Sequence, residues 1–198
     1  MARKLFGIRG LDVETEMRGY YPRGGGMVTL RVEPMVPGAT LTPAVLEDRG
    51  EVIRIHGLVF VAGNLPIDVA VKMRKTVLIR LRTEGYDCIA TLEEDIKAEK
   101  LQNGIGTASG IILWAETSTG CIIAGSALGE KGTPTTQTAM NATQGLLDNL
   151  AHNGCVDEYL QDQIIIFMAL AEGKSRVVTG PLTLHTHTAI HVAQELTE

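Results

Sequence analysis

The stretch LPIDVAVKMRKTVLIRLRTEG, residues 65–85, decides the fold class, because the hydrophobic period of the chain changes there. The segment before it, EVIRIHGLVFV (51–61), has the composition of a β-strand. Within 65–85 the apolar side chains recur at helical spacing, and the basic side chains lie between them. This spacing predicts an amphipathic helix of about five turns, with Pro66 near its start and Gly85 at its end. The apolar stripe comprises Val69, Met73, Val77, Leu78 and Leu81.

The segments around this helix favour strands and turns. We predict a strand from 86 to 92, and a long polar, glycine-rich loop from 93 to 110. Residues 111–116 and 121–128 predict a hairpin around TSTG. Further strands are predicted before the helix, over residues 11–17, 27–35, 39–50 and 51–61.

The last third of the chain favours helices. Residues 133–154 predict one helix, with Thr133 as its N-cap, Pro134 as its first residue and Gly154 as its stop. A second helix is predicted over 156–173. A short strand at 175–180 follows, and residues 182–196 should pass from strand into helix near Thr186–Thr188. Mixed strands and helices with hairpins predict an α+β protein, with α/β split sheets and helices packed on one face.

Composition narrows the class of protein. The chain has 198 residues, of which 44% are hydrophobic and 21% charged, as in ordinary globular proteins. No run approaches the ~18 apolar residues of a membrane span, and the N-terminus lacks a secretory signal. We therefore expect a soluble, intracellular protein without a membrane partner. Cys88, Cys121 and Cys155 are widely spaced without a CxxC motif, which favours reduced thiols over disulfides or zinc.

Basic residues are concentrated in two places, although the net charge is −5. The first 31 residues carry six lysines and arginines, and residues 72–82 carry five with no acid. Such runs are typical of solvated surface, and they also fit a local phosphate-binding strip on an acidic protein. The sequence leaves both interpretations open.

Three histidines, His185, His187 and His191, lie in the stretch GPLTLHTHTAIHVAQEL, residues 180–196. His185 and His187 would share one face of a strand, and His187 and His191 one face of a helix. A zinc site is one interpretation, but the change from strand to helix keeps the three rings from converging. A single nucleophilic or acid–base histidine, or ordinary surface histidines, are the alternatives.

The predicted helix 156–173 offers such a histidine a partner. Its apolar stripe comprises Leu160, Ile164, Phe167 and Ala171. On another face, Tyr159 can stack on a base, Gln163 can hydrogen-bond to its edge, and Asp162 can accept from a ribose hydroxyl or orient a histidine. An ordinary polar helix face is the alternative.

The loop RGYYPRGGG, residues 18–26, is a third candidate. Its glycines allow the backbone to approach a phosphate, and Arg18 and Arg23 can supply charge-assisted hydrogen bonds to phosphate or RNA. The loop has neither the Walker pattern nor GxGxxG, and a plain hairpin turn is the alternative.

Four stretches together resemble the RNA 3′-terminal phosphate cyclase family, and most of all its eukaryotic members. They are RGYYPRGGG (18–26), LGEKG (128–132), VDEYLQDQIIIFMALAEGKSRVVTGPLTLHT (156–186) and TAIHVAQEL (188–196). Their order and spacing match across essentially the whole chain. The resemblance implies a nuclear enzyme that uses ATP and Mg²⁺, or another divalent cation, to convert RNA 3′-phosphate ends to 2′,3′-cyclic phosphates.

The resemblance also implies residue roles and domains. A histidine attacks the α-phosphate of ATP, and AMP then passes to the RNA 3′-phosphate, which the 2′-hydroxyl cyclises. The nucleophile falls on His185, whereas His187 and His191 fall on variable positions. The adenylate-binding segment falls on Tyr159, Leu160, Gln161, Asp162 and Gln163. Residues 1–60 and 155–198 correspond to a large domain of βαβ-type repeats, and 61–154 to an inserted smaller α/β domain, similar to the C-terminal domain of a bacterial translation initiation factor.

One departure from the family concerns its glycine-rich N-terminal motif, which carries an acidic metal ligand and arginines that contact RNA. Residues 1–198 contain no such motif, so the chain resembles the C-terminal half or more of a cyclase, lacking the final segment, and we expect no metal ligands in it. We expect the chain alone to be inactive or nearly so. Two other functions remain open. One is a non-catalytic relative that acts in ribosome assembly and lacks the nucleophilic histidine, and the other is a zinc hydrolase.

Overall fold

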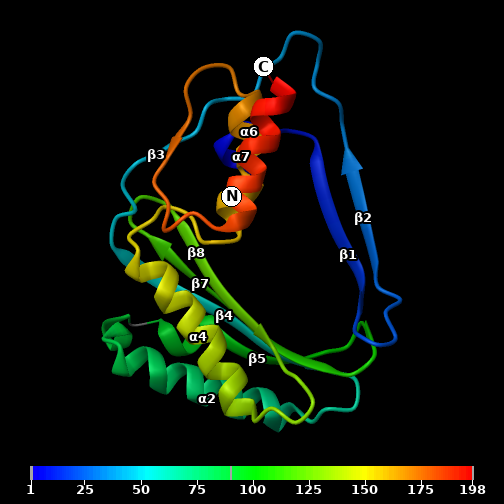
Figure 1. The fold of residues 1–198 in the computed structure, drawn as a ribbon. Helices are drawn as coiled ribbons and strands as arrows, with labels where there is room; N and C mark the ends of the chain where they lie inside the picture. The colour runs from blue at the N-terminus through cyan, green and yellow to red at the C-terminus, as the bar shows by residue number, and fades with distance from the viewer. Residues whose placement is uncertain (1, 90, 198) are drawn as a thin grey trace.

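The computed structural model describes residues 2–89 and 91–197, and its centre is a four-stranded sheet (Figure 1). The strand order is β5 (Ile96–Leu101), β4 (Val52–Ala62), β7 (Ala108–Thr117) and β8 (Ile122–Leu128). β4 pairs in parallel with β5 and antiparallel with β7, which forms an antiparallel hairpin with β8. Helices α2 (Ile67–Thr83) and α4 (Thr135–Ala151) cover one face of this sheet. The α+β class and the β7–β8 hairpin are therefore confirmed.

Helix α2 confirms the predicted amphipathic helix. Its buried residues are Ala70, Met73, Val77, Leu78 and Leu81, and they pack into the main hydrophobic core with the inner face of the sheet. Three of its arginines bind groups of the protein itself. Arg74 donates to the Ile96 carbonyl, Arg82 pairs with Glu93, and Arg80 lies 2.8 Å from Glu84. These contacts favour the surface-charge interpretation of residues 72–82 over a phosphate-binding strip.

Helix α4 was predicted in the right place, but its ends differ. Its N-cap is Pro134 rather than Thr133, and the helix ends at Ala151 with His152 as C-cap. Asn153 follows with a φ of 56°, so an asparagine takes the left-handed conformation after the helix, one residue before Gly154, the predicted stop. The helix lies so close to β8 that a Cβ at Gly125 would come within 2.2 Å of the Leu146 nitrogen. Gly125 therefore permits this close approach.

Residues 86–110 differ most from the prediction. The expected strand 86–92, of which residue 90 lies outside the described residues, is a 3₁₀ turn, η1 (Tyr86–Cys88), followed from Leu92 by α3 (Leu92–Asp95). The expected loop 93–110 contains β5, the short β6 (Gly104–Ile105) and the start of β7. β5 has the sequence IKAEKL. Its charged residues hid the strand, which forms because its backbone pairs with β4.

The remaining elements gather around a second, smaller hydrophobic cluster. It comprises the buried Phe6, Ala44, Val156 and Ile164, packed by neighbours from helices α1 (Ala2–Leu5), α5 (Leu160–Gln163) and α6 (Ile165–Leu170). Helix α7 (Leu184–Thr197) packs against α5 and α6, and β3 (Val45–Leu46) pairs in parallel with β9 (Arg176–Val177). A long hairpin, β1 (Leu11–Gly19) and β2 (Met27–Val32), stands to one side (Figure 1).

Three predictions in this region were wrong in part. The strand expected at 39–50 is limited to β3, because most of that segment is irregular. The single helix expected at 156–173 is two short helices separated at Ile164, and Val156 instead forms a parallel bridge with Thr179. The strand expected before Thr186 is helical from Leu184. The proposed domain division at residues 60 and 154 stays a prediction. Among the described helices, none has the length and apolar character needed to cross a membrane.

Candidate active site

The first turn of α7 presents His185 to the exterior. Thr183 caps this turn, because its Oγ1 accepts a hydrogen bond from the Thr186 backbone N–H at 3.2 Å. The first N–H groups of a helix lack partners within the helix, so this end favours a negatively charged ligand. His185 is exposed, whereas Thr186 beside it is buried. The cap therefore fixes the start of the helix and leaves the imidazole exposed.

Gln161, from α5, holds this turn in place. Its Oε1 accepts from Thr186 Oγ1 at 2.8 Å and from the Thr183 N–H at 3.3 Å, and its Nε2 donates to the Pro181 carbonyl at 3.4 Å. Gln161 is 2% exposed, and its bond to Thr186 is buried, whereas the other two bonds are part-buried. The predicted adenylate-binding segment 159–163 and the predicted nucleophile are thus joined through one buried side chain.

The five residues of that segment point in different directions. Tyr159 and Gln163 are exposed, and Leu160 packs against the second hydrophobic cluster. Asp162 is partly buried, and within the described part of the chain its Oδ1 is a buried oxygen without a hydrogen-bond partner. Gln161 had less physical support in the sequence than Tyr159, Asp162 and Gln163, yet it is the residue of this segment that contacts the turn carrying His185.

Sequence reasoning missed Asp157, whose carboxylate connects the start of this segment to the central sheet. Its Oδ1 accepts from the N–H groups of Tyr159 and Leu160, at 3.1 and 2.8 Å, and so caps α5. Its Oδ2 accepts from the Ala124 N–H on β8 at 3.0 Å. Asn149 of α4 adds a second link, because its Oδ1 accepts from the Glu158 N–H at 3.0 Å. Aspartate is one of the residue types preferred at helix starts, and this preference is the signal that could have pointed to Asp157.

A polar cavity of about 290 Å³ lies beside this network, between α4 and the residues that precede α7. It is slightly smaller than the ~300–1,000 Å³ of typical ligand sites. Two carboxylates line it, so it is not an electropositive phosphate site by itself. His185 does not line it. The lining residues are Gly145, Asp148, Asn149, His152, Glu158, Gln161, Gly180, Pro181, Leu182 and Thr183.

The three histidines of the stretch 180–196 all lie on α7, contrary to the expected strand–helix change. Successive residues of a helix are 100° apart, so His185 and His187 are about 200° apart around the axis. Within residues 2–89 and 91–197, no group of three or more His, Cys, Asp or Glu side chains is placed to hold a metal ion. Among the described residues, therefore, no such cluster offers a site for zinc or Mg²⁺.

Arg18 and Arg23 belong to a separate region, at the turn of the β1–β2 hairpin. Both are exposed, and Gly24 and Gly25 take φ values of 62° and 76°, as the tight turn requires. The turn hydrogen-bonds to the segment before β7, through the Tyr20 N–H and the Ile105 carbonyl at 2.9 Å. Asp157, by contrast, meets the sheet at Ala124, opposite Trp114 of β7. Trp114 is six positions along β7 from Ala108, or about 20 Å, so the arginines lie near a different part of the sheet from the part that Asp157 contacts.

Residues 1–198 match the sequence profile of a family described as RNA 3′-terminal phosphate cyclase. The chain belongs to the RNA 3′-terminal phosphate cyclase family. It is 39% identical over 187 residues to a "Probable RNA 3′-terminal phosphate cyclase" of Dictyostelium discoideum, a match that covers 94% of this chain and 42% of the relative. Proteins named RNA 3′-terminal phosphate cyclase from Pyrobaculum aerophilum and Drosophila melanogaster are 35% and 34% identical, over 96% and 98% of this chain.

The cyclase-family chain thus spans about half the length of these relatives, since the matches to the last two cover 51% and 52% of those proteins. Its membership of the cyclase family confirms the resemblance drawn from the sequence motifs. The comparisons give no residue roles. The assignments of His185 and of residues 159–163 within the cyclase family therefore stay predictions.

Proposed function

We propose that this chain carries the nucleophile of an ATP-dependent RNA 3′-phosphate cyclase, with His185 as the acceptor of AMP. The observation that supports this most is the pair of hydrogen bonds that the Gln161 Oε1 accepts, from the Thr183 N–H and the Thr186 hydroxyl. These bonds tie the predicted adenylate-binding segment to the turn that bears His185. ATP, when bound, supplies an activated AMP group. The chemistry divides one difficult ring closure into steps with good leaving groups.

In the first step, an imidazole nitrogen of His185 attacks the α-phosphorus of ATP. A phosphorus–nitrogen bond forms, the bond to the β-phosphate oxygen breaks, and pyrophosphate leaves with the electron pair. The ring then releases one proton to solvent. The exposed imidazole in the first turn of α7 suits this role, because developing negative charge on the phosphate lies near the N-terminal end of the helix.

In the next steps, an oxygen of the RNA 3′-phosphate attacks the same phosphorus, and the bond to His185 breaks. The adjacent 2′-hydroxyl then attacks the 3′-phosphate, closes the cyclic diester, loses its proton and expels AMP. This final step requires a ribose, so the substrate is RNA rather than DNA. Asp162, whose buried Oδ1 has no partner among the described residues, can accept a hydrogen bond from the ribose of the adenylate. Tyr159 is exposed beside it and can stack on the adenine ring.

No step is derived through a divalent cation, because the described residues form no site for one. The dependence on Mg²⁺ and the nuclear location stay predictions from the family resemblance. The activity of the isolated chain is expected to be low, because the family's glycine-rich motif does not occur in residues 1–198.

A chimera tests this proposal without requiring the isolated chain to be active. The present sequence replaces the matched 187 residues of the Dictyostelium relative, and the product is assayed for ATP-dependent cyclisation of a short RNA with a 3′-phosphate. His185→Ala should reduce the rate at least about 10⁴-fold, as loss of a covalent nucleophile does. His187→Ala, a matched change on another side of the same exposed turn, should leave it nearly unchanged. Equal activity of the two variants would rule out the role of His185.

A further inference from the structure

A cavity of about 510 Å³ lies at the turn of the β1–β2 hairpin, where the turn meets the loops that follow β4 and β6. The Asn64 N–H donates to the Thr107 Oγ1 at 3.4 Å, which joins the two loops. Among the described residues, no aspartate or glutamate lines this cavity, in contrast to the polar cavity beside Gln161. Tyr21, Arg23, Asn64 and Thr107 supply side chains that can bind a polar ligand.

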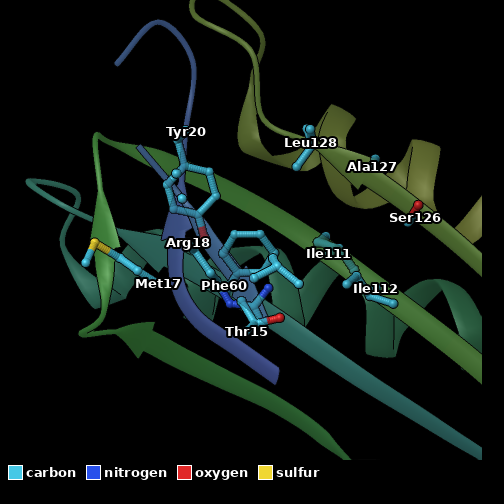
Figure 2. Close-up of a pocket in the computed structure, with 13 residues that line it drawn as sticks. Thr15, Met17, Arg18, Tyr20, Phe60, Ile111, Ile112, Ser126, Ala127 and Leu128 are labelled. Atoms are coloured by element: carbon cyan, nitrogen blue, oxygen red, sulfur yellow. The ribbon is translucent and has the colours of Figure 1, made fainter. Parts of the chain in front are cut away.

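Two adjacent tyrosines of the turn have opposite environments. The ring of Tyr20 stacks on Phe60 with centroids 6.2 Å apart, at one end of a larger cavity (Figure 2). The Tyr20 N–H donates to the Ile105 carbonyl at 2.9 Å, so this residue anchors the turn. Tyr21, by contrast, is 94% exposed. An exposed aromatic ring on an anchored turn is a surface on which a nucleic-acid base can stack.

The two arginines of the turn have no anionic partner within the protein. Arg23 lines the cavity beside Tyr21, and Arg18 lines a neighbouring cavity of about 280 Å³ with Gln102 and Asn103. Within residues 2–89 and 91–197, neither guanidinium forms an ion pair or a hydrogen bond. Five other arginines pair with carboxylates of the protein, namely Arg31, Arg54, Arg80, Arg82 and Arg176. The fork of donors on Arg18 and Arg23 is therefore open to a phosphate.

The groups at this turn match the chemistry of a nucleotide in a single strand. A guanidinium binds the phosphate, an aromatic ring stacks on the base, and a side-chain amide both donates to and accepts from a base edge or a 2′-hydroxyl. Tyr21, Arg23 and Asn64 supply these three groups at one cavity. No carboxylate of the described residues lines either cavity, so none repels a phosphate from its walls.

We propose that the turn of the β1–β2 hairpin binds one nucleotide of single-stranded RNA, several nucleotides away from the 3′ end that reacts at His185. Arg23 binds the phosphate, Tyr21 stacks on the base, and Asn64 hydrogen-bonds to the base edge or the 2′-hydroxyl. The inference rests on the proposed cyclisation of RNA 3′-phosphates, and it adds a contact to the body of that substrate.

The position of the turn along the sheet supports a contact upstream of the reacting end. The turn bonds to Ile105, just before β7 begins at Ala108, whereas Asp157 contacts the sheet opposite Trp114. Trp114 is six positions along β7 from Ala108, or about 20 Å. A stacked strand advances by ~3.4 Å per nucleotide, so roughly six nucleotides span this distance.

The dependence of cyclisation on RNA length tests this contact in the chimera described above. The KM of the chimera is measured for 3′-phosphorylated RNAs of about three and about twelve nucleotides, and we expect a lower KM for the longer RNA. Arg23→Gln and Tyr21→Ser should each reduce this advantage about fivefold or more. Tyr21→Phe keeps the ring and should retain the advantage. Arg31→Gln should retain it too, because this arginine of the same hairpin is already paired with Asp12.

Two results of the length experiment would overturn the proposal. One is an equal KM for the two RNAs in the unmodified chimera, or an advantage that neither Arg23→Gln nor Tyr21→Ser reduces. The other is a raised KM for ATP in Arg23→Gln with the length advantage intact, which would assign Arg23 to the phosphates of ATP instead.

A binding experiment on the full chain is independent of catalysis. Fluorescence anisotropy follows a labelled single-stranded RNA of about twelve nucleotides, without a 3′-phosphate, at several salt concentrations. Arg23→Gln should weaken binding and lower the slope of log K against log salt by about 0.7, as loss of one phosphate contact does. Arg31→Gln should keep the slope, and circular dichroism should be unchanged in all variants.

The binding experiment separates this inference from the proposed catalysis. An inactive chimera would count against the proposed function, whereas the affinity of the full chain for RNA would still decide the role of the turn. Absence of RNA binding at low salt would overturn the inference. Binding that is indifferent to both Arg23→Gln and Tyr21→Ser would overturn it as well.

Discussion

Gln161 and Thr186 are joined by a buried hydrogen bond of 2.8 Å, between the Gln161 Oε1 and the Thr186 Oγ1. The two residues lie 25 positions apart in the chain, on α5 and α7. Thr186 is the immediate neighbour of His185, so this bond fixes the turn from which the imidazole projects. The structure thus links the predicted adenylate segment and the predicted nucleophile by a contact that either pattern alone did not indicate.

The first prediction concerns Gln161. Gln161→Leu keeps the volume but leaves the Thr186 hydroxyl and the Thr183 N–H without their acceptor. We expect the free energy of unfolding to fall by about 1–3 kcal/mol, measured by urea denaturation. Gln161→Glu retains an acceptor oxygen, so its free energy of unfolding should fall by less than that of Gln161→Leu. Gln163→Leu, at an exposed position of the same helix, serves as the control. Equal losses for Gln161→Leu and Gln163→Leu would show that the buried bonds contribute nothing.

The second prediction concerns Asp157. Asp157→Ala removes three accepted hydrogen bonds, two that cap α5 and one from Ala124 on β8. The free energy of unfolding should fall by about 1.5–3 kcal/mol. Glu158→Ala, at an exposed neighbour, should change it by less than about 0.5 kcal/mol. Indistinguishable denaturation midpoints for the two variants would contradict the role given to Asp157.

A third prediction concerns the ion pair of Arg54 and Asp95, in which the Arg54 Nε lies 2.6 Å from the Asp95 Oδ2. The hydrogen bond from Arg54, and then that from Thr91, hold the pKa of Asp95 well below its ordinary value. A lowered folded-state pKa means that the pair stabilises the protein above the unfolded pKa, about 3.9, and that this contribution is lost at lower pH. Arg54→Gln should therefore reduce stability by a constant amount from pH 7 to about 5, and by less below about 4.

The control for this pair is Arg31→Gln, which removes an exposed arginine 3.5 Å from Asp12. Exposed pairs contribute little, so its effect on stability should be small across the same pH range. Urea denaturation at several pH values measures the loss of stability against pH for Arg54→Gln and for Arg31→Gln. A difference between Arg54→Gln and the wild type that grows as the pH falls would have the wrong sign for this account.

The fourth prediction concerns the cysteines. Cys88 is exposed, whereas Cys121 and Cys155 are buried. Burial, and then the neighbouring Cys121, raise the pKa of the Cys155 thiol to about 11. The thiolate is the reactive form, so near pH 7.5 a thiol reagent should modify Cys88 quickly and Cys155 only after unfolding. Cys88→Ser should abolish the fast phase. A fast phase that persists in Cys88→Ser would contradict the burial of the other two thiols.

The sequence predicted the elements with strong periodic patterns. Helix α2 was found because its apolar residues repeat at helical spacing, and the β7–β8 hairpin because two apolar runs flank the turn TSTG. Strand β5 was missed because its sequence, IKAEKL, is half charged and it forms by pairing with β4. The helix expected at 156–173 had a suitable apolar stripe, yet the structure has two short helices, α5 and α6, on either side of Ile164.

The candidate site was predicted in part. His185 and residues 159–163 came from the family resemblance, and the sequence could not show that Gln161 is the member that contacts the turn of His185. That relationship depends on how α5 and α7 pack, which no local spacing encodes. Asp157 carried a recognisable N-cap pattern, but its bond to Ala124 on β8 is a tertiary contact.

The most direct test of the account is to locate the AMP. The chimera with the Dictyostelium relative is incubated with ATP labelled at the α-phosphate, digested near neutral pH, and examined by fragmentation mass spectrometry. The account predicts an acid-labile AMP group on His185, retained in His187→Ala and His191→Ala and lost in His185→Ala. An AMP group on any other residue, or one that persists in His185→Ala, would contradict it.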